Sequence, residues 1–511
     1  MLMRPWLSRW SWSFLTGGPK PRRTRRRAIN LVAVRVQTLE PRVLLTAAAV
    51  GSEFQANTYT TGNQRTLVES PQSVATDADG DYVVTWASDG QDGSNSGIYA
   101  QWYNAAGVAQ GSEFRVSTYT TNSQRASTVA MDADGDFVMT WTSTGQDGSV
   151  DGIFARRYNA AGVAQGGEFR VNTYTTNAQS ASTVAMDADG DFVVIWSSFG
   201  QDGDVYGIYA QRYNAAGVAQ GVEFRVNTYT TSYQRYSTVA MDADGDFVVT
   251  WSSAQEDGGG YGIYAQRYNA AGAAQGSEFH VNTYTTSSQR YPKVALDADG
   301  DFVVTWSSFT QDDGTGFGVY AQRYNAAGVA QGSEFRVNTY TTNSQIFSTV
   351  AMDADGDFVV SWTSVVQDSG GYGIYAQRYN AAGVAQSSEF RVNTYTTNKQ
   401  YLSTVAMDAD GDFVVAWSSA NQAGAASGYD IYAQRYDDVG PDDADNAGPI
   451  VTDIVVAGDT LFANEQLVTP PAAVTVIFSE NMSVVGGTSG PASVINPANW
   501  SLTKDGSDLS S

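Results

Sequence analysis

The stretch VAMDADGDFVVTWSS at residues 239–253 decides the fold, because near copies of it recur along the chain. Every copy reaches a tryptophan, and these lie at Trp86, Trp141, Trp196, Trp251, Trp306, Trp362 and Trp417. A second pattern, GSEFRVNTYTT or a close variant, starts at Gly51, Gly111, Gly166, Gly221, Gly276, Gly332 and Ser387. Together they define seven units of about 55 residues. Self-similarity at such a period is typical of solenoids and propellers.

Each unit divides into four strand-like pieces separated by turn residues. In the second unit these are EFRVSTYT, STVAM, FVMTW and GIFARRYN, and the turns DADGD and NAAG contain the Asp, Asn and Gly that tight turns favour. Phe137, Met139 and Trp141 alternate with Val138 and Thr140, so both faces of this strand are suited to burial. Four short strands repeated seven times predict an all-β fold, a seven-bladed β-propeller over residues 51–437.

A linear β-solenoid is the alternative, although the nonapeptide pattern of calcium-binding β-rolls is absent. The array begins with an EFRV-type strand and ends with GYDIYAQRY at residues 428–436. We therefore expect strands from both ends of the array to share one blade, which would remove the exposed edge at the join.

Composition excludes several classes of function. The 511 residues contain no cysteine, which excludes disulfides, thiolate metal sites and cysteine nucleophiles. The formal net charge is -24, yet residues 1–50 hold ten bases and one acid, so the remainder carries 19 bases and 52 acids, a net charge of -33. A body this acidic repels phosphate and anionic lipid, so we expect no nucleic-acid partner. No run of 18 apolar residues predicts a transmembrane segment.

The two ends of the chain differ from the repeats. Residues 1–50 combine the basic run RRTRRR at 22–27, a short apolar segment and small residues at 47–49, which predicts a disordered export segment; a nucleic-acid-binding arm is the alternative. LEPRVLL at residues 39–45 resembles the LEPR-XLL N-terminal region of large bacterial surface or secreted proteins. An acidic linker at 438–449 precedes residues 450–511, where VTVIFSENM and VINPANW resemble a bacterial Ig-like domain of the surface-layer type. This segment is too short for a whole sandwich of about 100 residues, so it predicts a partial domain.

The repeat itself, around DGDFVVTW and GIYAQRYNAAG, resembles a poorly characterised repeat of large bacterial extracellular proteins. This resemblance covers residues 51–437 and implies an extracellular or cell-surface location more than an activity. The units match neither WD repeats, which place aspartate after tryptophan, nor the Asp box, which places tryptophan three residues after glycine.

The aspartate-rich turns admit two interpretations. The D-x-D-G-D spacing supplies alternating carboxylates, as calcium loops do, and the candidate ligands are Asp132, Asp134, Asp136, Asp187, Asp189, Asp191, Asp242, Asp244 and Asp246. The distal acid that would complete such a loop is missing. We therefore favour a hairpin turn in which Asp accepts backbone N–H groups, with calcium as the alternative and no other cofactor expected.

Variation among the copies marks a candidate binding face. The turns DADGD and NAAG barely change, whereas the loops before STVAM and after the tryptophan differ from unit to unit. Since alternate turns of a blade lie on one side, the variable loops share the opposite face. Aromatic rings in them could stack on sugars or contact a protein. The candidate ligand-binding residues are Phe199, Tyr233, Tyr236, Tyr291, Phe309, Phe347 and Tyr401.

Catalysis has little support in the sequence. The single histidine, His280, replaces an arginine of the other units, and no Ser/His/Asp set or phosphate-binding loop is present. Paired acids such as Asp147 with Asp151 would suit a glycosidase but are common in these loops. We therefore predict no enzyme but a non-catalytic adhesion module that binds glycan or protein. A purely structural module is one alternative, and a propeller glycosidase or lyase is another.

Overall fold

The computed structural model describes residues 48–437, apart from 71, 312–315, 369–370 and 425–427, together with short strands beyond them. Residues Leu44–Asp438 form one compact unit. The predicted export segment and LEPR-XLL region, up to residue 47, and the linker at 438–449 lie outside the described residues.

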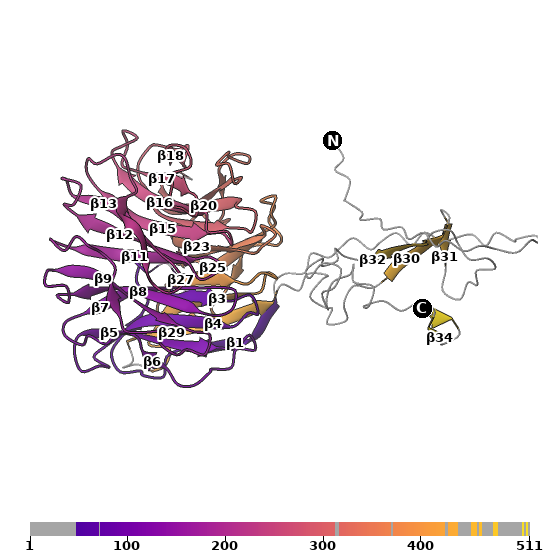
Figure 1. Ribbon diagram of the computed structural model, residues 1–511, viewed down its shortest axis with the longest axis horizontal. Coiled ribbons are helices and arrows are strands. Elements are labelled where there is room, and N and C mark those ends of the chain that lie inside the picture. The colour runs from indigo at the N-terminus through magenta and orange to yellow at the C-terminus, as the bar shows by residue number, and fades with distance from the viewer. Residues whose placement is uncertain are drawn as a thin grey trace, which may run out of the picture. The chain divides into compact units, whose positions relative to one another are not determined.

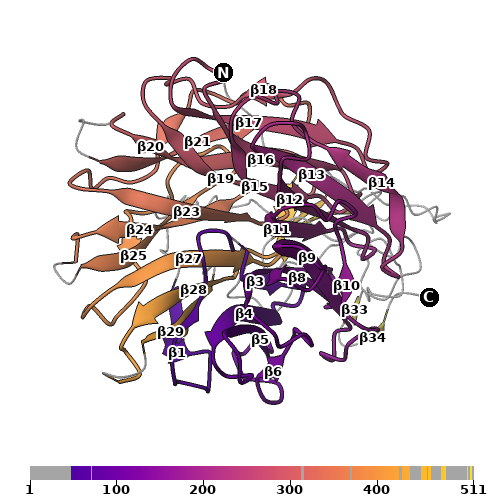
Figure 2. The same ribbon diagram turned by 90° about the vertical axis from the view of Figure 1, so that its left-hand side faces the viewer.

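The predicted seven-bladed propeller is confirmed: seven antiparallel sheets are arranged around one axis (Figure 1, Figure 2). The innermost strands are β2 (Gln64–Arg65) with β3 (Val74–Thr76), β7 (Gln124–Met131), β11 (Gln179–Met186), β15 (Gln234–Met241), β19 (Gln289–Leu296), β23 (Gln345–Met352) and β27 (Gln400–Met407). The second strands are β4 (Tyr82–Asp89), β8 (Phe137–Thr144), β12 (Phe192–Phe199), β16 (Phe247–Ala254), β20 (Phe302–Phe309), β24 (Phe358–Val365) and β28 (Phe413–Ala420).

The outer half of each blade contains a long third strand and a short fourth one. The third strands are β5 (Ser96–Tyr103), β9 (Asp151–Tyr158), β13 (Tyr206–Tyr213), β17 (Tyr261–Tyr268), β21 (Phe317–Tyr324), β25 (Tyr372–Tyr379) and β29 (Tyr429–Asp437). The outermost strands are β6 (Phe114–Arg115), β10 (Phe169–Arg170), β14 (Ala219–Arg225), β18 (Phe279–His280), β22 (Phe335–Arg336), β26 (Phe390–Arg391) and β1 (Ala48–Gln55). The EFRVSTYT strand is thus shorter than predicted and belongs to the preceding unit's blade.

The core consists of apolar layers between adjacent blades. In the second blade Trp141 is fully buried, and it packs with Met139 against Val83 and Ile98 of the first blade. All seven repeat tryptophans have no exposed surface. Both faces of each sheet are therefore covered, as the apolar alternation predicts, and burying so many large side chains is the main stabilising term.

Strands from the two ends of the array share the last blade, as the sequence predicts. β1 pairs antiparallel with β29, so the order in this sheet is β1-β29-β28-β27. The Glu53 carboxylate, close to the end of β1, accepts hydrogen bonds from the backbone N–H of Thr394 and the side-chain amide of Gln422, both at 2.6 Å. The ring is thus closed by contacts between residues more than 300 positions apart in the sequence.

Beyond the propeller, β30 (Val451–Val456) pairs with β31 (Asp459–Leu461) and β32 (Val474–Phe478), and β33 (Thr503–Lys504) pairs with β34 (Ser507–Asp508). These short pairings do not show the predicted Ig-like sandwich. Among the described residues, no helix is long and apolar enough to cross a membrane.

Candidate functional site

The aspartate-rich turns act as hairpin turns in which two of three carboxylates bind the backbone. Asp132 Oδ1 accepts the N–H groups of Asp134 (3.1 Å) and Asp136 (2.9 Å). Asp136 Oδ1 in turn accepts the N–H of Ala160, in the neighbouring NAAG turn, at 2.9 Å. The two conserved turns therefore lie on one face of the disc. The candidate calcium ligands of the next two blades repeat this geometry.

The packing of these turns explains both the glycine and the unusual first aspartate. Gly135 has φ +88°, and a Cβ there would lie 3.0 Å from Asp77 Oδ2 of the preceding blade. Burial, together with the charge of Asp412, raises the pKa of Asp408 to about 7. Among the described residues, no three His, Cys, Asp or Glu side chains are arranged to hold a metal ion. Calcium binding stays a prediction, which thermal unfolding with calcium and with chelator can test.

The predicted aromatic residues do not form one surface. Phe199 packs edge-on against Tyr206, with the ring centroids 5.0 Å apart, and Tyr233 stacks on Tyr206 at 6.2 Å. Phe309 and Tyr401 likewise pair with the first residues of their own third strands, Phe317 and Tyr429. These four predicted residues are therefore spread over separate blades.

The other three predicted residues meet near the axis. Tyr236 and Tyr291 have ring centroids 4.6 Å apart, and Tyr291 and Phe347 are 5.0 Å apart. Each occupies a bulge of an innermost strand, where the backbone takes a positive φ that is costly for a bulky residue. The bulge residues and their φ values are Ala126 (53°), Ala181 (58°), Tyr236 (57°), Tyr291 (60°), Phe347 (59°) and Leu402 (57°). We call this ring, with Leu67 and Val68, the axial mouth.

The axial mouth is asymmetric although the blades are nearly identical. Two neighbouring blades contribute alanine, the next three contribute aromatic rings, and the seventh contributes Leu402. The first blade has no such bulge, because its unit carries extra residues between Arg65 and Val74. Leu67 and Val68 of this insertion help to line a pocket with Tyr291, Phe347 and Leu402. The axial mouth is therefore lined by different residues in different blades, although the rest of each blade repeats.

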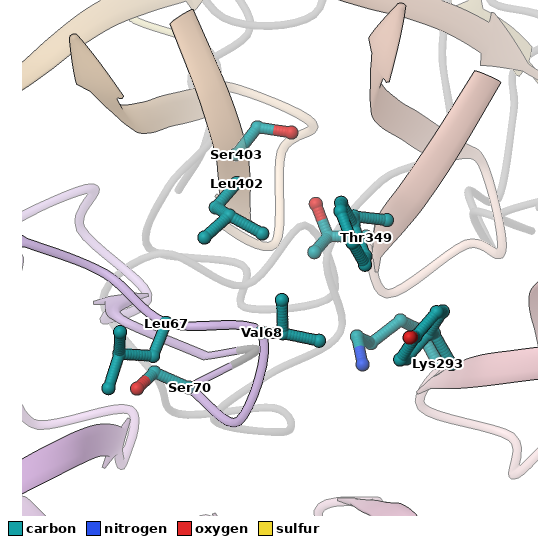
Figure 3. A pocket seen from close by; sticks show the side chains of 9 residues that line it. Leu67, Val68, Ser70, Lys293, Thr349, Leu402 and Ser403 are labelled. Carbon is teal, nitrogen blue, oxygen red and sulfur yellow. The ribbon is translucent and has the colours of Figure 1, made fainter. Parts of the chain in front are cut away.

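Lys293 lies in this pocket and was missed by the sequence analysis. The pocket has a volume of about 20 Å³, enough for one water-sized group. Its polar lining includes Thr349, Ser70 and Ser403, and Figure 3 shows the Lys293 amino group reaching toward Val68. The signal was present in the sequence as PKVAL at residues 292–296, where five other units have STVAM and the first has QSVAT.

Burial changes the proton affinity of this lysine. The side chain is almost fully buried, and Nζ donates a hydrogen bond of 3.1 Å to the carbonyl of Pro292. Loss of hydration lowers the pKa of Lys293 to about 7. The equivalent residue in the next blade, Thr349, bonds the Ser361 hydroxyl at 2.9 Å instead. One substitution thus converts a ring of hydroxyls into a site with a titratable amine.

Two arginines flank the aromatic side of the axial mouth. In the second blade Arg125 forms an ion pair of 2.8 Å with Asp151, the first residue of β9. The residues equivalent to Asp151 in the fourth and fifth blades are Tyr261 and Phe317. In the described part of the chain, neither Arg235 nor Arg290 forms an ion pair.

Instead, each of these arginines lies over the tyrosine that begins the third strand of the preceding blade. The Arg235 guanidinium carbon is 4.5 Å from the Tyr206 ring centroid, and that of Arg290 is 4.3 Å from the Tyr261 centroid. The result is an alternating series of tyrosine and arginine across three blades, beside the ring of Tyr291.

The fourth blade carries a second cluster of unusual titratable groups. In six blades a glutamine side chain donates to a glutamate, for example Gln201 to Glu223 at 2.6 Å. The fourth blade has Glu256 at the glutamine position, and its carboxyl group hydrogen-bonds to Glu278. Burial first, then this contact, raises the pKa of Glu256 to about 7. Glu256 therefore keeps its proton to a higher pH than an ordinary glutamate, in the arrangement that its six counterparts define.

His280 lies beside this carboxyl pair. Its Nε2 is 3.7 Å from Asp257 Oδ2, and its ring packs on Tyr264 with a centroid separation of 4.9 Å. Burial lowers the pKa of His280, against the opposing effect of Asp257. The paired acids that would suit a glycosidase, Asp147 and Asp151, both have other partners. Asp151 forms an ion pair with Arg125, and Asp147 Oδ1 accepts the Ser149 N–H at 3.0 Å.

Comparisons with protein-family models and with curated proteins found no match. Among solved structures, the polysaccharide lyase Uly1 matches with 11% identity and a TM-score of 0.47, over 76% of this chain and 94% of that one. The β-propeller domain of the Trilobed protease from Pyrococcus furiosus matches with 8% identity and a TM-score of 0.43, over 76% and 99%. A Penicillium chrysogenum α-L-arabinanase matches with 14% identity and a TM-score of 0.40, over 61% and 92%.

These findings correct the predicted function. The prediction of a non-catalytic adhesion module is wrong as the main interpretation, since the solved structures similar to this chain include a polysaccharide lyase, an arabinanase and arabinofuranosidases. Of the seven predicted aromatic residues, four lie on separate blades and three meet at the axial mouth, so they do not form one recognition face. The expectation that the protein is no enzyme is not confirmed. At these identities and TM-scores the likeness carries no argument for an activity, so an activity has to be argued from this chain's own residues.

Proposed function

We propose that this protein is an enzyme that cleaves an acidic polysaccharide by elimination at the axial mouth, with Lys293 as the proton acceptor. The observation that carries the proposal is a buried lysine in an axial pocket, at a position where the other blades have serine or threonine. A purely structural ring gains nothing from burying one amine among hydroxyl groups, since desolvating it is costly.

Lys293 has the properties of a general base at neutral pH. An ordinary lysine with a pKa near 10.4 is almost always charged, whereas burial brings the pKa of Lys293 to about 7. Roughly half of the molecules then carry a neutral amine at that pH, and a base whose pKa lies near the working pH is the most effective. Tyr291, whose pKa is raised by burial, keeps its proton and could act as the acid.

The elimination requires no group from outside except water. The pocket admits only a water-sized group, so one water takes the proton from the sugar carbon next to the carboxyl group while it gives a proton to Lys293 Nζ, and the C–H electron pair forms a carbon–carbon double bond. The bond to the glycosidic oxygen breaks, and this oxygen leaves with its electrons and takes a proton from the Tyr291 hydroxyl or from water. The lysine then returns its proton to solvent, and Tyr291, where it was the donor, regains one from solvent. Only a sugar with a carboxyl group has a carbon-bound proton acidic enough for this step, so the substrate is a uronate-containing polysaccharide.

The pocket lining does not suit two-carboxylate hydrolysis. The nine residues that line it include a lysine and a tyrosine but no aspartate or glutamate. Glu256 and Glu278, the carboxyl pair of the fourth blade, bond directly to one another, whereas glycosidases separate their carboxyl groups by about 5 Å or more. The half-buried rings of Tyr236, Tyr291 and Phe347 supply a surface on which a sugar could stack. Since polysaccharides of this kind lie outside cells, we also propose an extracellular location.

The test is incubation of the protein with uronate-containing and neutral polysaccharides, while ultraviolet absorbance of the unsaturated product and new reducing ends are both followed. We expect both signals on uronate polymers, with kcat/KM rising with pH through about 7 as Lys293 loses its proton. Lys293→Thr, which restores the residue of the other blades, should lower kcat by at least about a hundredfold. Lys399→Thr, on the same face, is the matched control and should leave kcat unchanged. Reducing ends without the unsaturated product, or no product on any polymer, would overturn the proposal.

A further inference from the structure

We propose that Arg235 and Arg290 bind the carboxylate of a uronate residue and thereby determine substrate specificity. This inference rests on the proposed function for its setting, because it places the substrate at the axial mouth. It is carried by a different observation, the loss of the acidic partner that keeps the equivalent arginine of the second blade engaged.

The seven blades provide an internal comparison for these arginines. Arg125 forms an ion pair with Asp151 and donates to it through both terminal nitrogens, at 3.3 and 2.8 Å. Arg65 of the first blade pairs with Asp89 at 3.5 Å. In the fourth and fifth blades an aromatic residue stands where Asp151 stands in the second. Among the described residues, Arg235 and Arg290 thus keep the positive charge but have no acidic partner within their own blades.

Stacking positions the two guanidinium groups through their faces. A guanidinium that lies over a tyrosine ring is positioned through its face, whereas its N–H donors project from its edge. Arg290 Nε is buried and has no hydrogen-bond partner among the described residues. A carboxylate fits such a planar fork with two parallel hydrogen bonds, and charge-assisted bonds of this kind are stronger than neutral ones.

The position of Arg290 connects it to the pocket of Lys293. Both residues lie on β19, separated by Tyr291 and Pro292, and Tyr291 hydrogen-bonds to Arg290 as well as lining the pocket. A carboxylate on Arg290 would therefore lie at the same strand as the lysine, on the aromatic side of the axial mouth. Because the chain after residue 50 carries a net charge of -33, an anionic polymer needs such a local cationic site to bind at all.

The experiment measures binding apart from turnover. Calorimetry with the full chain carrying Lys293→Thr would compare a uronate oligosaccharide, a neutral oligosaccharide of equal length and a sulfated neutral one. We expect binding of the uronate oligomer alone, and a loss of about tenfold in affinity for each of Arg235→Gln and Arg290→Gln. Arg290→Lys should fall between wild type and Arg290→Gln, because charge is kept and the fork is lost. Lys399→Gln, which removes a cation 4.9 Å from the Tyr372 ring on the same face, should bind normally.

The outcomes separate this inference from the proposed function. Arginine-dependent binding without cleavage by the wild-type protein would support the carboxylate site and overturn the elimination. Cleavage that depends on Lys293 but not on either arginine, with unaltered thermal stability of the arginine variants, would overturn the carboxylate site. Equal affinity for the sulfated neutral oligomer would also overturn it, since the arginines would then read negative charge rather than a carboxylate.

Discussion

In six blades a glutamine amide donates to a glutamate, and in the fourth blade Glu256 occupies the glutamine position against Glu278. A carboxyl group can donate only when it is protonated, so the same contact has become dependent on pH. Glu278 also accepts the backbone N–H of Thr228 at 2.6 Å, which ties the third blade to the fourth. A single substitution therefore places a titratable group at a junction between blades.

The sign of the resulting pH dependence follows from linkage. The pKa of Glu256 is about 7 in the folded state, against an ordinary value of 4.5, so the folded protein binds more protons between these values. The contribution of Glu256 to the free energy of unfolding is therefore full below about pH 4.5, and it is lost as pH rises through about 7. Because the group is half-buried and screened, we expect Glu256→Gln to gain on the order of 1 kcal/mol at pH 8 and almost nothing at pH 4.

Urea unfolding of the two proteins at both pH values measures this difference. The matched control is Gln201→Glu, which creates the same carboxyl pair with Glu223 in the third blade and should lose stability at pH 8. Other buried acids such as Asp408 share the sign of this effect, but they are present in every variant and cancel in the comparison. Identical pH dependence of wild type and Glu256→Gln would contradict the shared proton.

At the scale of the element, the insertion of the first unit is what encloses the axial pocket. Thr66 Oγ1 donates to the carbonyl of Leu402 at 3.0 Å, and the Ser73 N–H donates to Thr404 Oγ1 at 3.1 Å. These bonds anchor the two ends of the loop on the seventh blade. Val68, between them, lines the pocket beside Lys293 and helps to keep bulk water from its amino group.

We therefore predict that replacing residues 66–73 with the Ala-Ser-Thr of the second blade raises the pKa of Lys293 toward its usual value near 10.5. Water would enter the pocket and stabilise the charged amine. The inflection of kcat/KM against pH, or direct titration of the lysine by NMR, would then move to higher pH. An inflection that stays near 7 would mean that the loop does not exclude water from the amine.

Most elements were predictable, because turns and alternation are local signals. FVMTW, STVAM and GIFARRYN correspond to β8, β7 and β9, and Trp141 packs between blades as expected. EFRVSTYT is predicted as one long strand, yet only Phe114 and Arg115 form ladder pairs and the Val116 N–H makes one more bond, to Ile98, before the chain crosses to the next blade. Propensity favours a strand over the whole stretch, but the geometry of the crossing prevents it.

At the scale of the whole molecule, ring closure depends on one N-terminal strand. We predict that a chain beginning at residue 57 unfolds roughly 10 °C below one beginning at residue 48, because the shorter chain lacks β1 and leaves β29 with an open edge. Scanning calorimetry of both chains tests this. Equal midpoints would show that closure contributes little to stability.

The site at the axial mouth was less predictable than the propeller, because it depends on how different blades converge. Lys293 is a single substitution in a chain of 511 residues. Its side chain lies near the propeller axis, and that position is defined only when all seven blades have assembled. Tyr236 and Tyr233 look equally exposed in the sequence, yet a bulge turns the first toward the axial mouth and leaves the second on Tyr206. Alternation shows which side of a sheet a residue occupies but not which residues converge around a centre.

Closure by β1 also fixes the order of events in biosynthesis. Among the propeller strands the ribosome makes β1 before the others, but its partner β29 begins at Tyr429. β1 therefore cannot pair until most of the chain has been synthesised. During that interval the last-made blade exposes an unpaired edge, and the final contact joins residues at great separation in the sequence, which slows folding. A nascent chain of this protein is therefore an open arc that needs protection from its neighbours until synthesis of the last blade is complete.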